Sequence, residues 1–218
     1  MKIKDNVFYY FVKILKTMHM DKRIIQHLQQ DKILYQAIQK VDLVVEKPKI
    51  SLFEHLLKSI VSQQLSLQAA ATIHTRFRNS IKTLDVLPQH IFDKNHDELR
   101  AFGLSNQKAR YLQNIAEYFE ENNLMNYDWS QLSDEEIVEK LIPIKGVGIW
   151  TIQMILIFHL GREDVFPTDD LAIKNRICKW YEIEGNGKEV LLRMNEIAST
   201  WQPYRSIACR YIWAAGDL

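Results

Sequence analysis

The chain has 218 residues, of which 47% are apolar and 25% are charged, so it is long enough to bury a core and too apolar to be intrinsically disordered. Its 28 basic and 27 acidic residues give a formal net charge of +1, which neither requires nor excludes a polyanionic partner. The two cysteines, Cys178 and Cys209, form no C-x-x-C pair or cluster, which excludes a cysteine-bound zinc or iron–sulfur centre and indicates core thiols in a reducing compartment.

The N-terminal segment, MKIKDNVFYYFVKILKTMHMDK, carries an apolar run that Lys13 and Lys16 interrupt. The run is too short and too charged to cross a bilayer, and the segment lacks the small-residue cleavage site of a signal peptide. We therefore expect a cytoplasmic protein, in the bacterial cytosol, that does not bind membranes.

Apolar residues recur at intervals of three and four along most of the chain, which has only 7 glycines and 5 prolines. This pattern predicts an all-α protein. Ser51 and Glu54 form a capping-box pattern at one helix start, residues 63–66 interrupt the apolar stripe that follows, and Ser66 can cap a second helix. The stripes of these two helices consist of Phe53, Leu57, Ile60, Val61, Ala69, Ala70, Ile73 and Phe77.

Two further helices are predicted in the middle of the chain. Gly103 suits a helix end and Ser105 a helix start, and Ser133 with Glu136 forms a second capping box. Only residues 41–50, which contain the sequence KPK, favour an extended linker. The apolar stripe after Ser105 consists of Tyr111, Leu112, Ile115, Ala116 and Phe119.

The sequence EKLIPIKGVGIW predicts two helices joined by a tight turn. A helix over residues 134–142 ends before Pro143, residues 144–148 turn, and a second helix covers about residues 149–160. Glycines in such a turn let backbone N–H groups point outward and bind a DNA phosphate, while the carbonyls of the turn can hold a Na⁺ or K⁺ ion. The alternative is a glycine-rich turn without a ligand. The candidate DNA-binding residues are Ile144, Lys145, Gly146, Val147, Gly148 and Thr151.

Two adjacent aspartates follow this hairpin. Thr168 or Asp169 can cap a helix over about residues 170–181, and with Asp169 as the cap, Asp170 takes the first helical position, where the helix dipole stabilises its charge. The alternative is that both aspartates serve only the helix start. A carboxylate close to a phosphate-binding turn suits cleavage of a nucleoside's glycosidic bond, because the sugar becomes cationic as the base departs.

The stretch LIPIKGVGIWTIQMILIFHLGREDVFPTDDLAIK resembles the signature of the helix-hairpin-helix (HhH-GPD) DNA glycosylases. Three other stretches, SIVSQQLSLQAAATIHTRF, GLSNQKARYLQNIA and WQPYRSIACRYIWAAGDL, are similar to the branch that contains the DNA-3-methyladenine glycosylase II enzymes. The resemblance covers about residues 51–216. The longer bacterial enzymes begin with a β-rich domain, which about 50 mostly helical residues cannot contain, so we expect the compact, all-helical form.

The resemblance implies a monofunctional enzyme. Asp170 takes the position of the catalytic aspartate, and Asp169 orients the helix beside the lesion pocket. Trp150 stands where glycosylases with lyase activity carry a lysine, and an indole cannot form a Schiff base, so simple hydrolysis should leave an abasic site. Trp213 matches an aromatic residue of the lesion pocket, with Trp150 expected near it. Met154 stands where the bacterial relatives carry a pocket tyrosine.

The resemblance also implies how the protein engages DNA. Gln64, with Leu65 as its neighbour, takes the position of the wedge that fills the space of a flipped base. A polar pair at a helix break is the alternative reading of this position. The implied partner is double-stranded DNA that contains alkylated bases, bound by a monomer without cofactor or iron–sulfur cluster. Basic side chains that could contact phosphates, or merely be solvated, are Arg76, Arg78, Lys108, Arg110 and Lys174.

We expect three regions within a two-lobed helical fold. Residues 1–50 pack with the C-terminal lobe, residues 51–165 form a helical barrel that includes the hairpin at 134–160, and residues 166–218 carry the catalytic aspartate. The resemblance implies an active-site cleft between the lobes. Two alternatives stay open: a non-catalytic DNA-binding module built on the hairpin, and a glycosylase for an oxidised or mismatched base.

Overall fold

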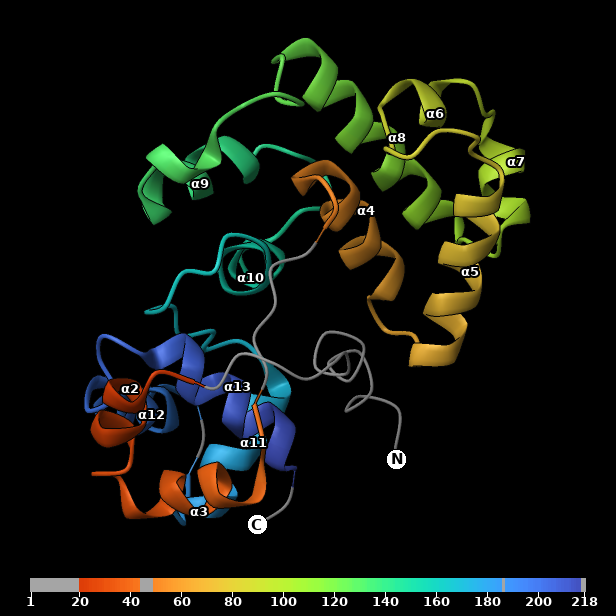
Figure 1. The fold of residues 1–218 in the computed structure, drawn as a ribbon. Coiled ribbons are helices and arrows are strands. Elements are labelled where there is room, and N and C mark those ends of the chain that lie inside the picture. The colour runs from red at the N-terminus through yellow and green to blue at the C-terminus, as the bar shows by residue number, and fades with distance from the viewer. Residues whose placement is uncertain (1–19, 44–48, 186, 217–218) are drawn as a thin grey trace. The chain divides into compact units, whose positions relative to one another are not determined.

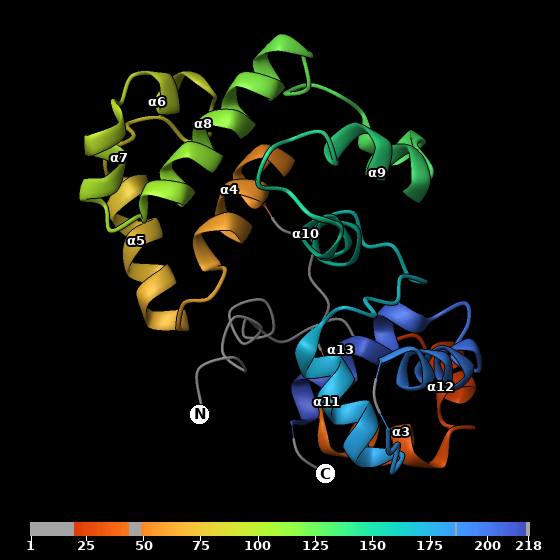
Figure 2. The ribbon, with the colours of Figure 1, turned by 180° about the vertical axis from the view of Figure 1, so that it is seen from behind.

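The computed structural model describes residues 20–43, 49–185 and 187–216 (Figures 1 and 2). Every regular element in these ranges is helical, which confirms the predicted all-α class. The expected structure of the N-terminal segment and part of the expected linker at residues 41–50 lie outside the described residues. In the described ranges, no helix has the length and apolarity that crossing a membrane requires.

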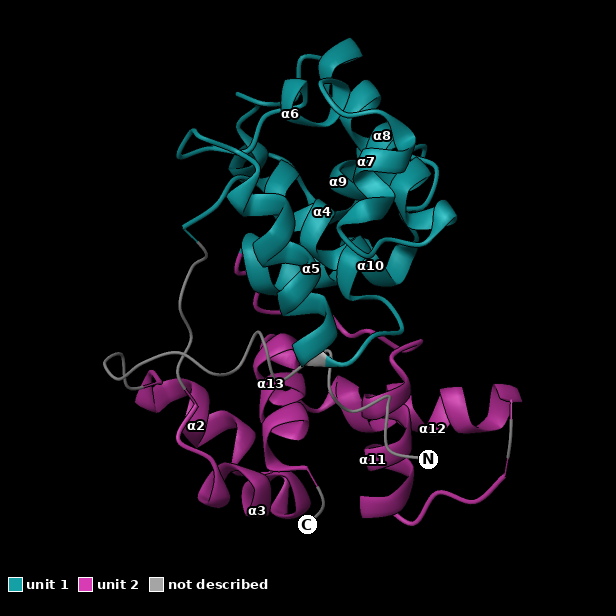
Figure 3. Ribbon diagram, turned by 90° about the vertical axis from the view of Figure 1, so that its right-hand side faces the viewer, with its two compact units in different colours: residues 1–7, 47–160 teal, residues 8–46, 161–218 magenta. Residues whose placement is uncertain are grey.

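The chain divides into two compact units (Figure 3). Unit 1 contains the described residues of the range 47–160, and unit 2 contains those of the ranges 8–46 and 161–218. The first described helices thus share a unit with the C-terminal part of the chain, from which they are far apart in sequence.

Unit 1 is built around α4, which packs against α5 and α8. The apolar stripe predicted for α4 is buried, and the ring of Phe53 lies against that of Phe119 with centroids 5.2 Å apart. The elements of the unit are α4 (Leu52–Ser62), α5 (Leu67–Asn79), α6 (Gln89–Phe92), α7 (His96–Ala101), α8 (Asn106–Glu121), a 3₁₀ turn (Trp129–Gln131), α9 (Asp134–Leu141), α10 (Ile149–Met154) and a π turn (Ile155–His159).

The predicted helix starts of unit 1 are confirmed. The side chains of Ser51, Ser66, Ser105 and Ser133 each accept a hydrogen bond from a first-turn backbone N–H group. Ser133 forms the complete capping box with its partner glutamate. The capping box predicted for Ser51 is incomplete, because the carboxylate of Glu54 lies 3.6 Å from each of the side chains of Lys58 and His74 and does not bond the Ser51 backbone.

Two histidines face each other inside unit 1. His55 of α4 and His159 at the end of the π turn have Nδ1 atoms 3.2 Å apart, and their rings are nearly perpendicular. Burial, the neighbouring His159 ring and the charge of Lys58 together lower the pKa of His55 to about 3, with burial as the largest cause. Burial also lowers the pKa of His159 to about 4. The pair is therefore neutral in the folded protein at neutral pH.

We expect this pair to make the protein sensitive to mild acid. Both folded pKa values lie below the ordinary value of 6.5, so the unfolded chain binds more protons, and stability falls as the pH drops below about 6.5. His55 alone should remove about 2 kcal/mol of unfolding free energy between pH 7 and pH 5. Urea unfolding over this range measures the effect. His55→Gln should flatten the pH dependence, and His96→Gln, at a half-buried position outside this pair, should leave it intact. An unchanged slope in His55→Gln contradicts the assignment.

Unit 2 packs α3 and α11 against α13 and also α11 against α12. Trp180 and Trp201 are buried and form part of its core. The elements of the unit are α2 (Lys22–Leu28), α3 (Lys32–Lys40), α11 (Leu171–Trp180), α12 (Gly187–Ser199) and α13 (Arg205–Ala215).

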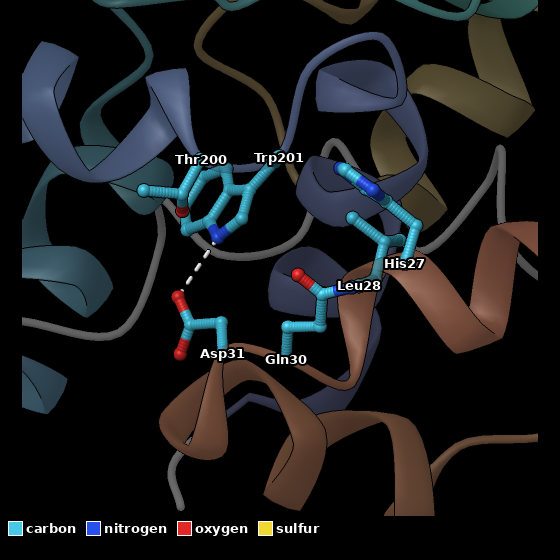
Figure 4. A pocket seen from close by; sticks show the side chains of 6 residues that line it. All are labelled: His27, Leu28, Gln30, Asp31, Thr200 and Trp201. Carbon is cyan, nitrogen blue, oxygen red and sulfur yellow. Dashed lines mark hydrogen bonds between the residues drawn. The ribbon is translucent and has the colours of Figure 1, made fainter.

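Asp31 ties the first helices of unit 2 to its C-terminal part. Its Oδ1 caps α3, and its Oδ2 accepts hydrogen bonds from the Tyr181 hydroxyl at 2.6 Å and from the Trp201 indole at 2.8 Å. Burial, together with the bond to Asp31, raises the pKa of Tyr181. A cavity of about 370 Å³ includes Asp31 and Trp201 in its lining. Figure 4 shows the side chains that line it, those of His27, Leu28, Gln30, Asp31, Thr200 and Trp201. None of the predicted site residues lines it.

Candidate nucleic-acid interface and active site

The predicted helix–turn–helix is present in unit 1. The first helix, α9, ends at Leu141, one residue before the predicted end, and α10 begins at Ile149 as predicted. The second helix does not continue as an α-helix to residue 160, because its hydrogen bonding changes to a π turn after Met154. In the turn, the side chains of Ile144 and Val147 are buried and anchor the loop. Any contact that these two residues make with DNA would therefore come from their backbone.

Gly146 is required by packing inside the protein. Its φ is +106°, and a Cβ atom at this position would lie 2.3 Å from the ring of Tyr111. Tyr111 belongs to α8, and Asn114 of the same helix donates a hydrogen bond to the Lys145 carbonyl at 3.1 Å. The hairpin is thus held against α8, a contact between distant segments that the sequence pattern did not reveal.

Gly148 has no such internal reason to be glycine. It is the N-cap of α10, its φ of −104° is open to any residue, and an added Cβ would meet no protein atom within 4 Å. No side chain makes a capping hydrogen bond at this helix start. The first-turn amides of a helix carry partial positive charge, so this open end can bind an anion. The exposed side chains of Lys145 and Ile149 flank it.

Thr151 connects the hairpin to the turn after α4. Its hydroxyl accepts a hydrogen bond from Gln63 Nε2 at 3.3 Å, and the residue is 2% exposed. Of the other two predicted residues on α10, Trp150 is half-buried and Met154 is buried.

The candidate wedge lies in the turn between α4 and α5. Gln64 is exposed and has a φ of +58°, a left-handed conformation that is uncommon for a residue other than glycine, and Leu65 is half-buried. Strained backbone of this kind persists where the surroundings hold it in place, and it is frequent at functional sites.

Lys108 holds this turn, which corrects its assignment as a candidate phosphate contact. Its ammonium group donates hydrogen bonds to the carbonyls of Val61 at 2.7 Å and Gln63 at 2.6 Å. The carbonyls at the end of a helix have no partner within the helix, and a cation there is stabilised by the dipole. Burial lowers the pKa of Lys108 to about 8. The ammonium group of Lys108 therefore stabilises the turn after α4, within unit 1.

In unit 2, Asp170 is itself the N-cap of α11, which corrects the predicted helix start. Its carboxylate accepts from the Ile173 N–H group at 2.9 Å. Asp169, which was expected to cap or orient this helix, is exposed and makes no capping bond. The reason is the turn before the helix, in which the Asp170 N–H group bonds the Pro167 carbonyl and leaves Asp170 with the extended backbone that a cap requires.

Asp170 and Trp213 are in direct contact. The indole Nε1 of Trp213 donates a hydrogen bond to Asp170 Oδ1 at 2.9 Å, and the two residues are 5% and 6% exposed, respectively. The same oxygen accepts the bond from Ile173, so two N–H donors fix the orientation of a buried carboxylate. The start of α11 and the helix α13 thus bring Asp170 and Trp213 together to form the candidate active site in unit 2.

The buried cysteine beside this centre is a packing residue, as predicted. Burial raises the pKa of the Cys209 thiol, and the charge of Asp170 raises it further. Cys178 is half-buried, and both thiols are free. Among the described residues, no group of three or more His, Cys, Asp and Glu side chains could hold a metal ion.

Comparison with known proteins agrees with these features. Residues 57–203 match the HhH-GPD superfamily of base excision DNA repair proteins. A DNA-3-methyladenine glycosylase of Schizosaccharomyces pombe is 36% identical over 169 residues, which cover 76% of this chain and 73% of that protein. A provisionally named DNA-3-methyladenine glycosylase of Bacillus subtilis is 32% identical over 170 residues, 75% of this chain and 58% of that protein. The chain therefore spans less than two thirds of this Bacillus relative.

Solved structures show the same relationship. The S. pombe 3-methyladenine DNA glycosylase in complex with abasic DNA gives a TM-score of 0.75 at 31% identity, covering 88% of this chain and 95% of that chain. A DNA-3-methyladenine glycosidase of Bacillus halodurans gives 0.75 at 31% identity and 93% coverage of both chains. The chain belongs to the HhH-GPD superfamily of base excision DNA repair proteins, in the branch of the DNA-3-methyladenine glycosylases.

Proposed function

We propose that the protein is a monofunctional DNA glycosylase that removes alkylated bases from double-stranded DNA. The observation that carries this proposal is the buried carboxylate of Asp170, oriented by the Trp213 indole at 2.9 Å. A carboxylate that served only as a helix cap would need only the bond to the helix backbone. The second donor comes from another helix and fixes the group in one orientation, as a reacting sugar requires.

The chemistry follows from the charge of the substrate. Alkylation at N3 or N7 of a purine makes the base cationic, so the base leaves with the electron pair of the glycosidic bond and becomes neutral. The sugar then carries positive charge, which the Asp170 carboxylate stabilises. A water molecule adds to the sugar carbon and gives up a proton, with Asp170 assisting, and an abasic site remains.

Trp150 supports hydrolysis as the complete reaction. Strand cleavage by the lyase route needs an amine that forms a Schiff base with the sugar, and an indole cannot do this. The exposed Lys145 lies in the hairpin turn, where a contact with the DNA backbone is its proposed role.

For the lesion pocket we propose aromatic recognition. The indole faces of Trp213 and Trp150 would attract a cationic base by stacking and by cation–π interaction of about 0.5–2 kcal/mol. Met154, which is buried, adds apolar surface without a hydrogen-bonding group. Such a pocket selects charge and shape, and the names of the related glycosylases point to 3-methyladenine and similar bases.

DNA binding is proposed to use the hairpin and the turn after α4. The open N-terminus of α10 at Gly148 would bind a phosphate through backbone amides, with a Na⁺ or K⁺ ion on the hairpin carbonyls. Gln64, with Leu65 beside it, would fill the space of the flipped base. We propose that the protein acts as a monomer and needs no cofactor.

Base release from methylated DNA tests the proposal. Under single-turnover conditions, the protein should free 3-methyladenine or 7-methylguanine from a methylated duplex, and the strand should break only after alkali treatment. Binding of the duplex without base release would leave a DNA-binding module and contradict the enzyme. Release from oxidised or mismatched duplexes in place of methylated ones would contradict the substrate class.

A further inference from the structure

Arg176 of α11 reaches the end of the neighbouring helix α13. Its Nη1 donates hydrogen bonds to the Trp213 carbonyl at 2.8 Å and to the Ile212 carbonyl at 3.0 Å. Because α13 ends at Ala215, these carbonyls lie in its last turn. The guanidinium satisfies both carbonyls and places a positive charge at the negative end of the helix dipole.

Trp213 connects this contact to the carboxylate of Asp170. Its backbone carbonyl is held by Arg176, and its indole N–H group bonds Asp170. Asp170 in turn caps α11, the helix that carries Arg176. The hydrogen bonds therefore form a closed ring in which α11 fixes Trp213 at two points, at its backbone and at its ring.

This ring gives Arg176 a specific task. The indole N–H group can hold Asp170 only if the backbone of Trp213 stays in register with the start of α11. A displacement of about 1 Å in a positioned group is enough to slow an enzymatic reaction strongly. We propose that Arg176 is a positioning residue, which acts on the glycosidic bond through Trp213 and Asp170 and does not touch the substrate. The proposal rests on the function proposed for Asp170.

Three variants and one spectroscopic signal test this role. Arg176→Met keeps an apolar stem and removes the donors, Arg176→Lys restores one cationic donor group, and Arg193→Met is the matched control, since Arg193 is exposed and pairs with Glu196 on α12. The indole N–H signal of Trp213 in ¹⁵N-labelled protein is identified by its loss in Trp213→Phe. Single-turnover release of 7-methylguanine and affinity for an abasic-site duplex are measured on the same samples.

We expect Arg176→Met to shift the Trp213 indole signal, to speed its hydrogen exchange, and to slow base release about tenfold, while affinity for the abasic duplex stays within about twofold. Arg176→Lys should recover part of the rate, and Arg193→Met should match wild type. An unmoved indole signal overturns the proposal, and so does a loss of duplex affinity as large as the loss of rate. A wild-type protein that releases no base overturns the proposed function itself, whatever the indole signal does.

Discussion

Asp170→Asn should abolish base release while leaving the fold and DNA binding intact. Asparagine caps helices as well as aspartate does, and its side-chain oxygen can accept the same two N–H bonds, from Ile173 and from Trp213. The negative charge is lost, and with it the stabilisation of the cationic sugar. We expect the single-turnover rate to fall about 10²-fold or more.

The measurement is release of 7-methylguanine at saturating protein, with thermal melting and affinity for an abasic duplex as controls. The melting temperature should stay close to that of the wild type, because asparagine and aspartate are equally good helix caps. If the variant releases base at a rate within a few-fold of wild type, Asp170 is only a helix cap. If it fails to fold, Asp170→Ser, which also caps helices and also lacks the charge, is measured in its place.

The two hairpin glycines should respond to alanine in opposite ways. Gly146→Ala adds a methyl group 2.3 Å from the Tyr111 ring at a φ of +106°, so overpacking and backbone strain should together cost about 3 kcal/mol or more of unfolding free energy. Gly148→Ala adds a methyl group into open space at an accessible φ and should cost at most about 1 kcal/mol. The same methyl group would obstruct a phosphate at the start of α10, so DNA affinity should fall about tenfold.

Urea unfolding and duplex binding, measured on both variants, separate the two effects. Tyr111→Ala combined with Gly146→Ala should recover part of the lost stability, because it removes the clash and leaves the strain. Full affinity in Gly148→Ala would mean that the DNA backbone does not approach this helix end. Equal stability of the two variants would mean that the hairpin does not pack against α8 as described.

Local signals in the sequence were sufficient for most helix starts. Four serines cap helices where predicted, because a cap depends on a side chain and an amide a few residues apart. The same rule failed at the aspartate pair, where Thr168, Asp169 and Asp170 all satisfy the local pattern. The turn at Pro167 selected the last of them, and a periodicity argument carries no information about such a turn. The π turn after Met154 was missed for a similar reason, since the apolar pattern continues through it.

The candidate site required more than local pattern. Resemblance assigned Asp170, Trp213 and Gln64 to roles, but it did not reveal how they are held. Lys108 seemed a surface cation because the carbonyls that it bonds are far away in sequence. Arg176 gave no signal at all, since the carbonyls at a helix end cannot be matched with a donor on another helix from sequence alone.

The sequence by itself determined the all-α class, the positions of the capped helices, the hairpin between α9 and α10, and membership in the HhH-GPD superfamily. The helical class, the caps and the hairpin depend on residue spacing and short-range hydrogen bonds, whereas the superfamily was identified by the resemblance of whole motifs. Only the tertiary structure decided that Gly146 serves packing while Gly148 faces open space, that Lys108 holds the turn at Gln64, and that Trp213 orients Asp170. Each of these depends on which distant segments are brought into contact when the apolar faces are buried, because burial fixes the partners of polar groups that local sequence leaves open.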